Sequence, residues 1–577
     1  MNARARLTRA ALLTLLGGLV VLFWLDHLRL ALDKQYAIDE FQYAHGAWRI
    51  AQGDVIYRDF FEHHFPLVHQ LMAAVFLAAG DEDPNVIVYL RLAMLPFLTL
   101  LVAAAALVNR AYGWSGAVLT ALVVLAVPTL SMMAVEIRPD PLAFALFLAA
   151  LAVLYLPRPG RRWRGFLSGL LAVAALWGTL KAAYYGLIFP AALAADFLRR
   201  REDRDEDGFL LGHPVAFLAG GAAAALPIAV YLTWTGSWSA WFEWSIRWSF
   251  VHQLHYPGFF WTRNLTPLLA QSFWLFPLAA VGMAATWRSR PAPGSPDWLL
   301  LASAATTLAS FAWQSAAYLY SLIPFTAVLC VFAARGLAAS LRFMWNVRGA
   351  GTFAAVLLVL IAGVELRRAR ANLVQLRAVD NAAQHALLGR VGALTRPGEP
   401  VLNIAGGQVT RPSVHFFYFF EAVVRQLRHD VFAYELPRSL VEKGCIAYMP
   451  SERFGRLPAP LRRFLLENYL PYDRELWFWG RRYAVDGGEL AARFVAPRDG
   501  RYFVWPPEPP RRGELRIGER PVASPVFDLA AGDYGVTYRG ELRELFLVWL
   551  PADGRPFVPR PELQAAVQQT LPDESSQ

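Results

Sequence analysis

Four groups of charged residues stand at the ends of apolar stretches, where ionisable side chains are costly and usually functional. They are Asp39-Glu40, Arg91, the turn Glu136-Ile137-Arg138-Pro139-Asp140, and Lys181. A carboxylate in this set could deprotonate a hydroxyl nucleophile. The cations could bind a phosphate and stabilise its charge as it leaves. These residue types therefore fit chemistry on a lipid-linked phosphosugar whose tail stays in the membrane.

Each charged group also has a purely structural interpretation. Asp39 and Gln42 match a capping pattern in which the aspartate accepts a hydrogen bond from the first helical turn. The charges at 136–140 could form a salt bridge within a tight turn. Arg91 and Lys181 could extend along apolar helices towards the membrane surface. The sequence leaves both interpretations open for every group.

The composition is that of a membrane protein with a polar C-terminal part. The chain has 577 residues, 56% hydrophobic and 17% charged, with a net charge of +10, and its mean hydropathy is +0.33. These values exclude a disordered chain, which needs low hydrophobicity and high charge. Two cysteines, Cys330 and Cys445, exclude a disulfide framework, a Cys-rich zinc module and a Cys-ligated iron–sulfur cluster. Cys445 is expected to be buried.

The membrane part is predicted to span residues 1–378. A bilayer crossing needs about 20 apolar residues. About eleven stretches approach this length, at 9–25, 86–108, 115–133, 141–157, 165–180, 182–198, 214–233, 265–286, 298–313, 319–338 and 349–366. The first carries arginines before its apolar run and lacks a small-residue cleavage pattern, which indicates a retained signal anchor. We expect a polytopic α-helical protein of the cytoplasmic (inner) membrane.

Arginines set the predicted orientation, because short cytoplasmic loops are enriched in basic residues. They gather in residues 4–9, at Arg110 and in the segments 158–164, 199–204, 288–290 and 335–348, which alternate with less basic loops. This pattern places the N-terminus inside and the C-terminal region outside. It also accounts for much of the positive charge, so the sequence predicts no nucleic-acid partner.

The first external loop, residues 26–85, is predicted to hold two helices that lie on the membrane surface. Phe41, Ala44 and Trp48 recur at helical spacing, and 66–79 is apolar but too short to cross. A later loop carries tryptophans at helical spacing: Trp234, Trp238, Trp241, Trp244 and Trp248. They fit an aromatic belt at the headgroups, or a surface on which a sugar or lipid chain stacks.

The polar C-terminal part is predicted to form two extracytoplasmic domains. Residues 379–483 alternate short apolar runs with helical stretches, which indicates an α/β domain. Residues 484–560 hold short alternating runs between Gly-containing turns, which indicates a small β-sandwich. Residues 561–577 are expected to be a disordered tail.

A metal site is a weaker interpretation of a His-rich segment. His63 and His64 stand near Asp59, Glu62 and His69, but their spacing matches no standard zinc signature. We therefore expect no cofactor, with a divalent metal at these residues as the alternative. Segment 401–407 ends in glycine but lacks the glycine spacing of a nucleotide site.

Several of these residues resemble one family of membrane enzymes. The order Asp39-Glu40-x-x-Tyr43, Tyr57-x-Asp59-Phe60 and Pro66-Leu67, followed by Arg91, resembles the first external loop of integral-membrane GT-C glycosyltransferases. Protein O-mannosyltransferase-like and aminoarabinose-transferase-like families are the most similar groups. Two later stretches extend the resemblance, which covers about residues 9–340 in layout: Glu136-x-Arg138, and Tyr318 followed by Pro324. Pro139-Asp140 and Ser321 depart from the family pattern.

The resemblance implies an inverting enzyme that moves a sugar from a polyprenyl-phosphate donor to a hydroxyl of a glycan, lipid or protein outside the cytoplasm. It implies that Asp39 is the catalytic carboxylate, with Glu40 beside it. The implied roles of the other residues are donor-phosphate binding by Arg91, Arg138 and Lys181, and substrate binding by Glu136, Asp140, Tyr43 and Tyr318.

Two other classes of protein fit parts of the sequence. One is a carrier or flippase for lipid-linked or small substrates, although the charges gather at one face and no internal repeat is visible. The other is a non-catalytic envelope assembly protein whose outer β domain binds a polysaccharide or protein. Loss of a single sugar from the envelope glycans of a deletion strain separates the transferase from both.

Overall fold

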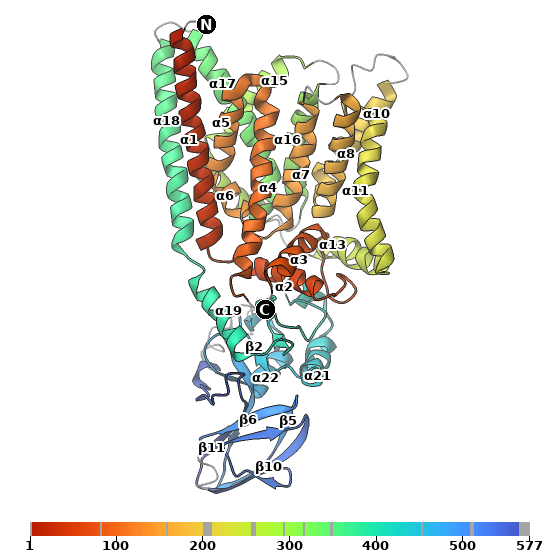
Figure 1. Cartoon of the computed structure of the whole chain (residues 1–577), viewed down its shortest axis with the longest axis vertical. Coiled ribbons are helices and arrows are strands. Elements are labelled where there is room, and N and C mark those ends of the chain that lie inside the picture. Colours follow the sequence, from red (N-terminus) through yellow and green to blue (C-terminus); the bar gives the residue numbers. More distant parts are fainter. Residues whose placement is uncertain are drawn as a thin grey trace.

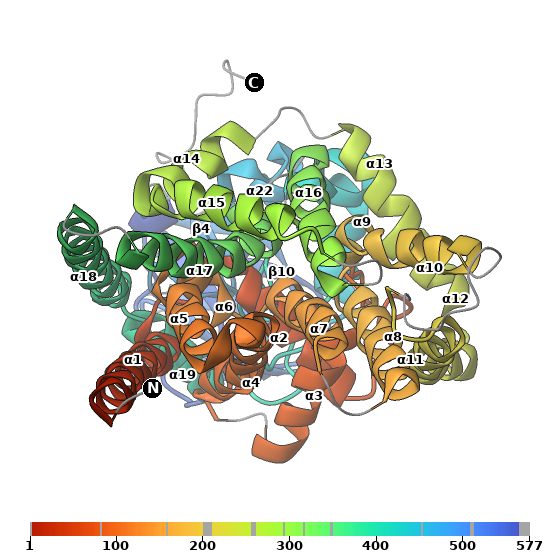
Figure 2. The ribbon, with the colours of Figure 1, turned by 90° about the horizontal axis from the view of Figure 1, so that it is seen from above.

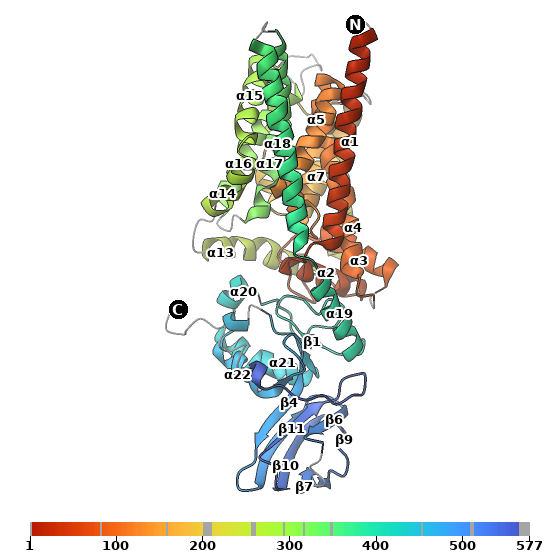
Figure 3. The same cartoon turned by 90° about the vertical axis from the view of Figure 1, so that its left-hand side faces the viewer.

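The chain folds into a helical bundle followed by a smaller part that contains the β-strands (Figure 1). This description uses a computed structural model, which describes residues 3–80, 83–156, 160–199, 210–255, 261–291, 295–314, 318–346, 350–419, 421–451, 454–507 and 513–564. The C-terminal part lies beyond one end of the bundle, and the N-terminus lies at the opposite end (Figures 1 and 3).

All eleven predicted apolar stretches coincide with helices. They are α1 (Ala3–Asp33), α4 (Val86–Val108), α5 (Gly113–Ala126) with α6 (Pro128–Ala134), α7 (Pro139–Leu154), α8 (Arg161–Gly178), α9 (Ala182–Tyr185) with α10 (Ile188–Arg199), α11 (Pro214–Trp234), α14 (Trp261–Ser272) with α15 (Leu275–Arg288), α16 (Pro296–Trp313), α17 (Ile323–Asn346) and α18 (Ala350–Ala378). Within the described residues, four helical segments are long and apolar enough to cross a membrane, or six if two bent pairs each form one span. The count of eleven spans stays a prediction.

Glycines set the closest helix contacts in the bundle. A Cβ at Gly169 of α8 would lie 1.9 Å from the carbonyl oxygen of Phe217 on α11, and one at Gly220 would lie 1.9 Å from that of Phe166. Helix α17 lies inside the bundle between α15 and α5 (Figure 2). Small residues allow such close backbone approach in membrane helices, so α8 and α11 form a tightly fixed pair.

Short helices lie across the end of the bundle that faces the C-terminal part (Figures 1 and 3). They are α2 (Ile38–Ala51), α3 (Leu67–Ala79), α12 (Trp238–Trp241) and α13 (Trp248–His255). The two surface helices predicted in the first loop are therefore present as helices. The tryptophans differ in exposure: Trp234 is 85% exposed, whereas Trp248 is buried and packs against Phe61, so Trp248 fits neither predicted role.

The C-terminal part contains two sheets. The larger joins β1 (Val401–Leu402), β2 (Ala447–Tyr448), β4 (Trp477–Ala484), β11 (Glu544–Trp549), β6 (Gly500–Trp505) and β9 (Val526–Leu529) in that order, with β3 (Tyr469–Pro471) on β4. The smaller joins β5 (Glu489–Ala496), β10 (Gly532–Gly540), β7 (Gly513–Ile517) and β8 (Arg520–Pro521). Four helices accompany the strands: α19 (Ala382–Leu394), α20 (Glu421–Gln426), α21 (Leu436–Glu442) and α22 (Ala459–Asn468).

The larger sheet crosses the boundary that the sequence predicted between residues 483 and 484. Strand β4 pairs with β2 on one side and with β11, from the other predicted domain, on the other. One hydrophobic core extends from Val391 to Leu550 and includes Trp477 and Phe503. The α/β and β segments therefore form one unit, because β4 contributes side chains to both.

The structure also bears on two smaller expectations for the C-terminal part, the tail that begins at residue 561 and the burial of Cys445. Gln564 donates to the carbonyl oxygens of Leu466 and Tyr469 at 3.0 and 2.7 Å, so the predicted tail is bound at its start. Residues 565–577 lie outside the described residues. Cys445 is buried, as expected, and its free thiol donates to the carbonyl oxygen of Ala447 at 3.4 Å.

The glycine contact between α8 and α11 gives a test of this packing. Gly169→Leu places a side chain where the Phe217 carbonyl already stands, so we expect a loss of stability of about 3 kcal/mol, at the upper end of ordinary overpacking. Gly17→Leu is the matched control, because nothing lies within 4 Å of a Cβ at Gly17. Thermal unfolding of both purified variants in detergent checks this, and equal midpoints would contradict the contact.

Candidate functional site

Asp39 is a partly exposed carboxylate in the first turn of α2. Its Oδ2 accepts a hydrogen bond from Nη1 of Arg138 at 2.9 Å, and its side chain is 34% exposed. The helix cap that the sequence assigned to Asp39 is instead made by Glu40, whose Oε2 accepts from the amide of Ala37 at 2.8 Å. The capping alternative for Asp39 is therefore wrong, and its carboxylate is available to the site.

Glu40, one residue later, is fully buried in an ion pair with Arg91. The guanidinium of Arg91 donates from Nε at 2.8 Å and from Nη2 at 2.6 Å to the two carboxylate oxygens. The amide of Ile137 donates to the same carboxylate at 3.1 Å. Burial alone would raise the pKa of Glu40, but the charge and hydrogen bonds of Arg91, with the charge of Lys34, outweigh it and lower the pKa.

The remaining donors of Arg91 are also occupied. Nη1 donates to the carbonyl oxygen of Lys34 at 2.5 Å and Nη2 to that of Gln35 at 3.0 Å. The guanidinium carbon lies 4.3 Å from the ring centroid of Tyr36. Arg91 is therefore not extended to the membrane surface. It ties the end of α1 to α2 and, through Glu40, to the turn before α7.

The turn 136–140 forms three ion pairs beside Asp39. Glu136 accepts from Nε of Arg138 at 2.5 Å and also pairs with Lys34, and Asp140 accepts from Nζ of Lys181 at 3.0 Å. The predicted internal salt bridge is thus present, but Arg138 also reaches Asp39. The structure brings Asp39, Arg138 and Lys181 to one end of the bundle.

Tyr320 lies between the two cations and was not selected from the sequence. The guanidinium carbon of Arg138 lies 4.6 Å from the centroid of its ring, and Nζ of Lys181 lies 4.3 Å from it. Tyr318, which the family motif did select, stacks against Tyr320 with centroids 5.5 Å apart. The spacing of two residues in Tyr318-Leu319-Tyr320 is the sequence feature that could have indicated Tyr320.

Tyr43 joins Asp39 to the His-rich segment. It lies one turn further along α2, and its Oη is 3.1 Å from Nε2 of His64. Nδ1 of His64 lies 2.7 Å from Oε1 of Glu62, and Oε2 of Glu62 lies 3.1 Å from Nε2 of His69. Burial raises the pKa of Glu62, but His69 and His64 outweigh this and hold it well below the usual range.

A metal ion is the alternative use of this segment. Single ligand atoms of Glu62, His63 and His64 lie within 4.8 Å of one another, so this group among the described residues could hold an ion. Glu62 Oε1 already accepts from the amides of His63 and His64 at 2.9 and 3.0 Å. The donor set fits a divalent metal in type, while the hydrogen bonds already orient Glu62 without one.

His45 fastens the C-terminal part to α2. It is fully buried, with Nδ1 2.7 Å from Oη of Tyr418 and Nε2 3.1 Å from the carbonyl oxygen of Arg411. Gly406 has a positive φ of 81°, and a Cβ there would lie 3.1 Å from both the Phe41 carbonyl oxygen and the His45 Cβ. The segment 403–419 is therefore pressed closely onto the helix that carries Asp39.

This interface predicts a pH dependence. Burial and the nearby charge of Arg49, offset in part by the Arg411 hydrogen bond, lower the pKa of His45 to about 3. The neutral ring contributes stability that is fully present above the unfolded pKa of about 6.5 and is lost as pH falls towards 3. We expect a loss of about 2 kcal/mol at pH 5 relative to pH 7.5.

Hydrogen exchange of 403–419 and of α2 at the two pH values measures this loss. His45→Gln removes the titrating group, so its exchange should depend less on pH. The variant should keep the part of the pH dependence that comes from His415, because burial lowers the pKa of that residue to about 4. An unchanged pH dependence in His45→Gln would contradict the assignment.

Comparison with known proteins supports the fold. No protein-family model matches the chain, and no curated protein sequence matches it. The apo structure of ArnT from Cupriavidus metallidurans is similar with a TM-score of 0.54 and 13% identity, covering 82% of this chain and 98% of ArnT. The apo oligosaccharyltransferase of Archaeoglobus fulgidus is similar with a TM-score of 0.51 and 12% identity, covering 79% of this chain and 73% of that one.

A second ArnT structure, bound to undecaprenyl phosphate, aligns over 68% of this chain and 82% of ArnT, with a TM-score of 0.46 and 16% identity. At these identities, the similarity to apo ArnT and to the oligosaccharyltransferase establishes the fold alone. The activity has to be inferred from the residues of the site. The resemblance drawn from the sequence over about residues 9–340 predicted this fold. The chain has the fold of the GT-C glycosyltransferases.

Proposed function

We propose that the protein is an inverting glycosyltransferase that moves a sugar from a polyprenyl-phosphate donor to an acceptor hydroxyl, with Asp39 as general base. One observation carries this proposal: Asp39 is partly exposed beside Arg138, while the adjacent Glu40 is fully buried and bonded to Arg91. A general base must be reached by the proton it removes. Asp39 meets that requirement and Glu40 does not.

The proposed reaction is a single displacement. Asp39 takes the proton of the acceptor hydroxyl, and the acceptor oxygen forms a bond to the anomeric carbon on the face opposite the phosphate. The bond between that carbon and the phosphate oxygen breaks, and its electron pair leaves with the phosphate. Attack from the opposite face inverts the anomeric configuration. The acceptor is a hydroxyl of a glycan, lipid or protein.

Arg138 and Lys181 are the proposed ligands of the donor phosphate. Both stand beside Tyr320, and the side chain of Lys181 is 22% exposed. Fixed cations stabilise the negative charge that develops on a leaving phosphate. Because the donors of Arg91 are all used, we assign Arg91 and Glu40 to positioning α2, although the family resemblance gave them direct roles.

The other residues selected from the sequence surround this centre. Glu136 and Asp140 orient the two cations, Tyr43 lies one turn from Asp39, and Tyr318 covers Tyr320. ArnT, which shares the fold, has been crystallised with undecaprenyl phosphate. We place this site at the outer face of the cytoplasmic membrane, with the C-terminal part outside, as the arginine distribution predicts.

The charge cluster favours this function over a carrier. Transporter sites lie near the bilayer midplane, at broken helices. Here α2, which carries Asp39, lies at the end of the bundle that faces the C-terminal part (Figures 1 and 3). Arg138 bonds to Asp39, and Lys181 contacts the same Tyr320 ring as Arg138. That position suits a reaction between a membrane lipid and an acceptor outside the membrane.

Substitution of the two adjacent carboxylates, Asp39 and Glu40, tests the proposal directly. Asp39→Asn should lower sugar transfer at least about 100-fold, because proton removal by a positioned base contributes at least that factor, while expression and thermal midpoint stay at wild-type values. Glu40→Gln leaves Arg91 buried without its charge partner and should cost about 3–5 kcal/mol of stability. Lipid-linked sugars and envelope glycans of a deletion strain complemented with each variant provide the measurement. Full restoration of the missing sugar by Asp39→Asn would exclude Asp39 as the base.

Lys181 tests the phosphate site separately. Lys181→Gln removes one charged hydrogen-bond donor, so undecaprenyl phosphate should bind about 10- to 100-fold more weakly, while Lys181→Arg retains most of the affinity. Lys443→Gln, on an exposed residue of the C-terminal part, is the control for loss of one positive charge. Binding is measured on purified protein by titration in detergent. Equal affinities of Lys181→Gln and wild type would remove Lys181 from the phosphate site.

A further inference from the structure

A cavity of about 750 Å³ lies between the starts of α8 and α11. Its position is far from Asp39. Helix α8 has 18 residues and is about 27 Å long at 1.5 Å per residue, and Lys181 follows its end by three residues at the charged site. The cavity therefore opens at the opposite end of the bundle, and α8 and α11 lie at the bundle's edge (Figure 2).

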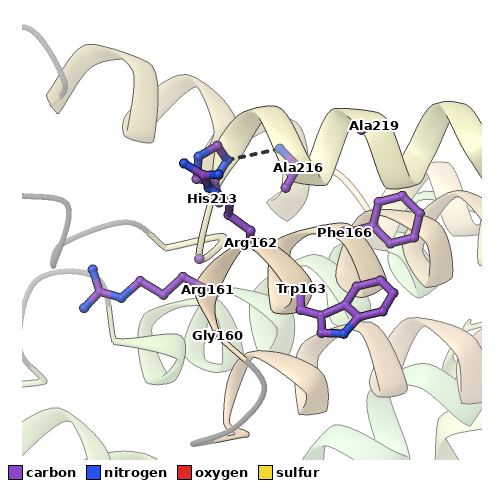
Figure 4. Close-up of a pocket in the computed structure, with 9 residues that line it drawn as sticks. Gly160, Arg161, Arg162, Trp163, Phe166, His213, Ala216 and Ala219 are labelled. Atoms are coloured by element: carbon purple, nitrogen blue, oxygen red, sulfur yellow. Dashed lines mark hydrogen bonds between the residues drawn. The ribbon is translucent and has the colours of Figure 1, made fainter.

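The two helices line the cavity with side chains of different size. Trp163 and Phe166, one turn apart on α8, form a wall of aromatic rings (Figure 4). Ala216 and Ala219, one turn apart on α11, leave space opposite them. The glycine contacts of Gly169 and Gly220 fix the separation of the helices below the cavity. A groove of fixed width, with one aromatic wall and one of methyl groups, fits an alkyl chain.

The mouth of the same groove is basic. Arg161 and Arg162 both line it, and among the described residues none that lines it is acidic. Figure 4 shows the side chain of Arg162 close to His213, and that of Arg161 extending away from the aromatic rings. Nδ1 of His213 accepts from the amide of Ala216 at 3.2 Å, so a neutral ring carries its proton on Nε2 as a further donor. These groups match the charge of a phosphodiester.

The groove also opens on the surface of the bundle that membrane lipid would contact. Trp163 is 53% exposed, and Val215 and Leu218 of α11, next to the lining alanines, are 52% and 48% exposed. Tryptophan is typical of the membrane–water interface. Arg161 and Arg162 belong to one of the arginine-rich segments that the sequence places on the cytoplasmic side. Basic pockets between membrane helices on that side bind anionic lipid headgroups.

We propose that this groove binds an anionic glycerophospholipid of the inner leaflet. Its phosphate lies against Arg161, Arg162 and His213, and one acyl chain lies between Trp163-Phe166 and Ala216-Ala219. A polyprenyl-phosphate donor is not the proposed occupant, because a phosphate here stands about the length of α8, ~27 Å, from Lys181 of the proposed donor-phosphate site. The proposal does not depend on the transfer reaction, since it uses other residues at the other end of the bundle.

Lipid retention by the full-length protein tests this site. The protein is purified in detergent, and phosphatidylglycerol or phosphatidylcholine is titrated in while bound lipid is counted by native mass spectrometry. We expect wild type to prefer phosphatidylglycerol. The double variant Arg161→Gln, Arg162→Gln should lower that affinity about five-fold for each arginine removed. The variant Arg288→Gln, Arg290→Gln, which makes the same charge change at residues that do not line the cavity, should bind as wild type does.

A second variant tests the chain-binding wall without changing charge. Ala219 is exposed, so Ala219→Trp fills the groove from the lipid side without entering the helix contact. It should reduce phosphatidylglycerol retention while the thermal midpoint of the lipid-free protein stays unchanged. Equal retention of the two phospholipids by wild type, or equal affinity of wild type and the double arginine variant, would overturn the proposal. Displacement of phosphatidylglycerol from the groove by an equimolar amount of undecaprenyl phosphate would also overturn it.

Discussion

The buried pair of Glu40 and Arg91 fixes the geometry on which the candidate site depends. A buried ion pair adds little net stability, because desolvation offsets the attraction, but it is costly to break. Here each partner also bonds to backbone: Glu40 to the amides of Ala37 and Ile137, and Arg91 to carbonyls at the end of α1. The pair thereby positions three chain segments against one another. Asp39 is exposed to the site as a consequence of its neighbour being held inside.

The C-terminal part is bound to this assembly at two places. His45 connects α2 to the segment 403–419, and Tyr36, before α2, bonds through its hydroxyl to His385 of α19 at 2.5 Å. The amide of Tyr36 also donates to the side chain of Gln384 at 2.7 Å. Helix α2 is thus held by Arg91 of the helical bundle and, separately, by the C-terminal part. The C-terminal part therefore contributes to placing Asp39.

The sequence predicted what local patterns determine. Apolar runs located the helices, and the position of charges at the ends of those runs located Asp39, Arg138 and Lys181. The sequence could not distinguish Asp39 from Glu40, because adjacent helical residues point about 100° apart and only the position of Arg91, 51 residues later, decides which is buried. The domain boundary at 483 failed for a similar reason, since the pairing of β4 with β11 joins residues that are distant in the chain.

Helix α8 connects the two ends of the bundle discussed above. Near its C-terminal end, three residues after Gly178, Lys181 pairs with Asp140. At its N-terminal end, Arg161, Arg162, Trp163 and Phe166 line the groove. A Cβ at Gly178 would lie 2.8 Å from that of Ala143 on α7, so the C-terminal end of α8 is fixed against the helix that carries Asp140. With Gly169 and Gly220 fixing the middle, α8 has little freedom to slide. A lipid that fills the groove would therefore affect the site only by stabilising the packing of α8 against α11. It would raise the fraction of molecules in which these two helices are packed, and it would not move Lys181.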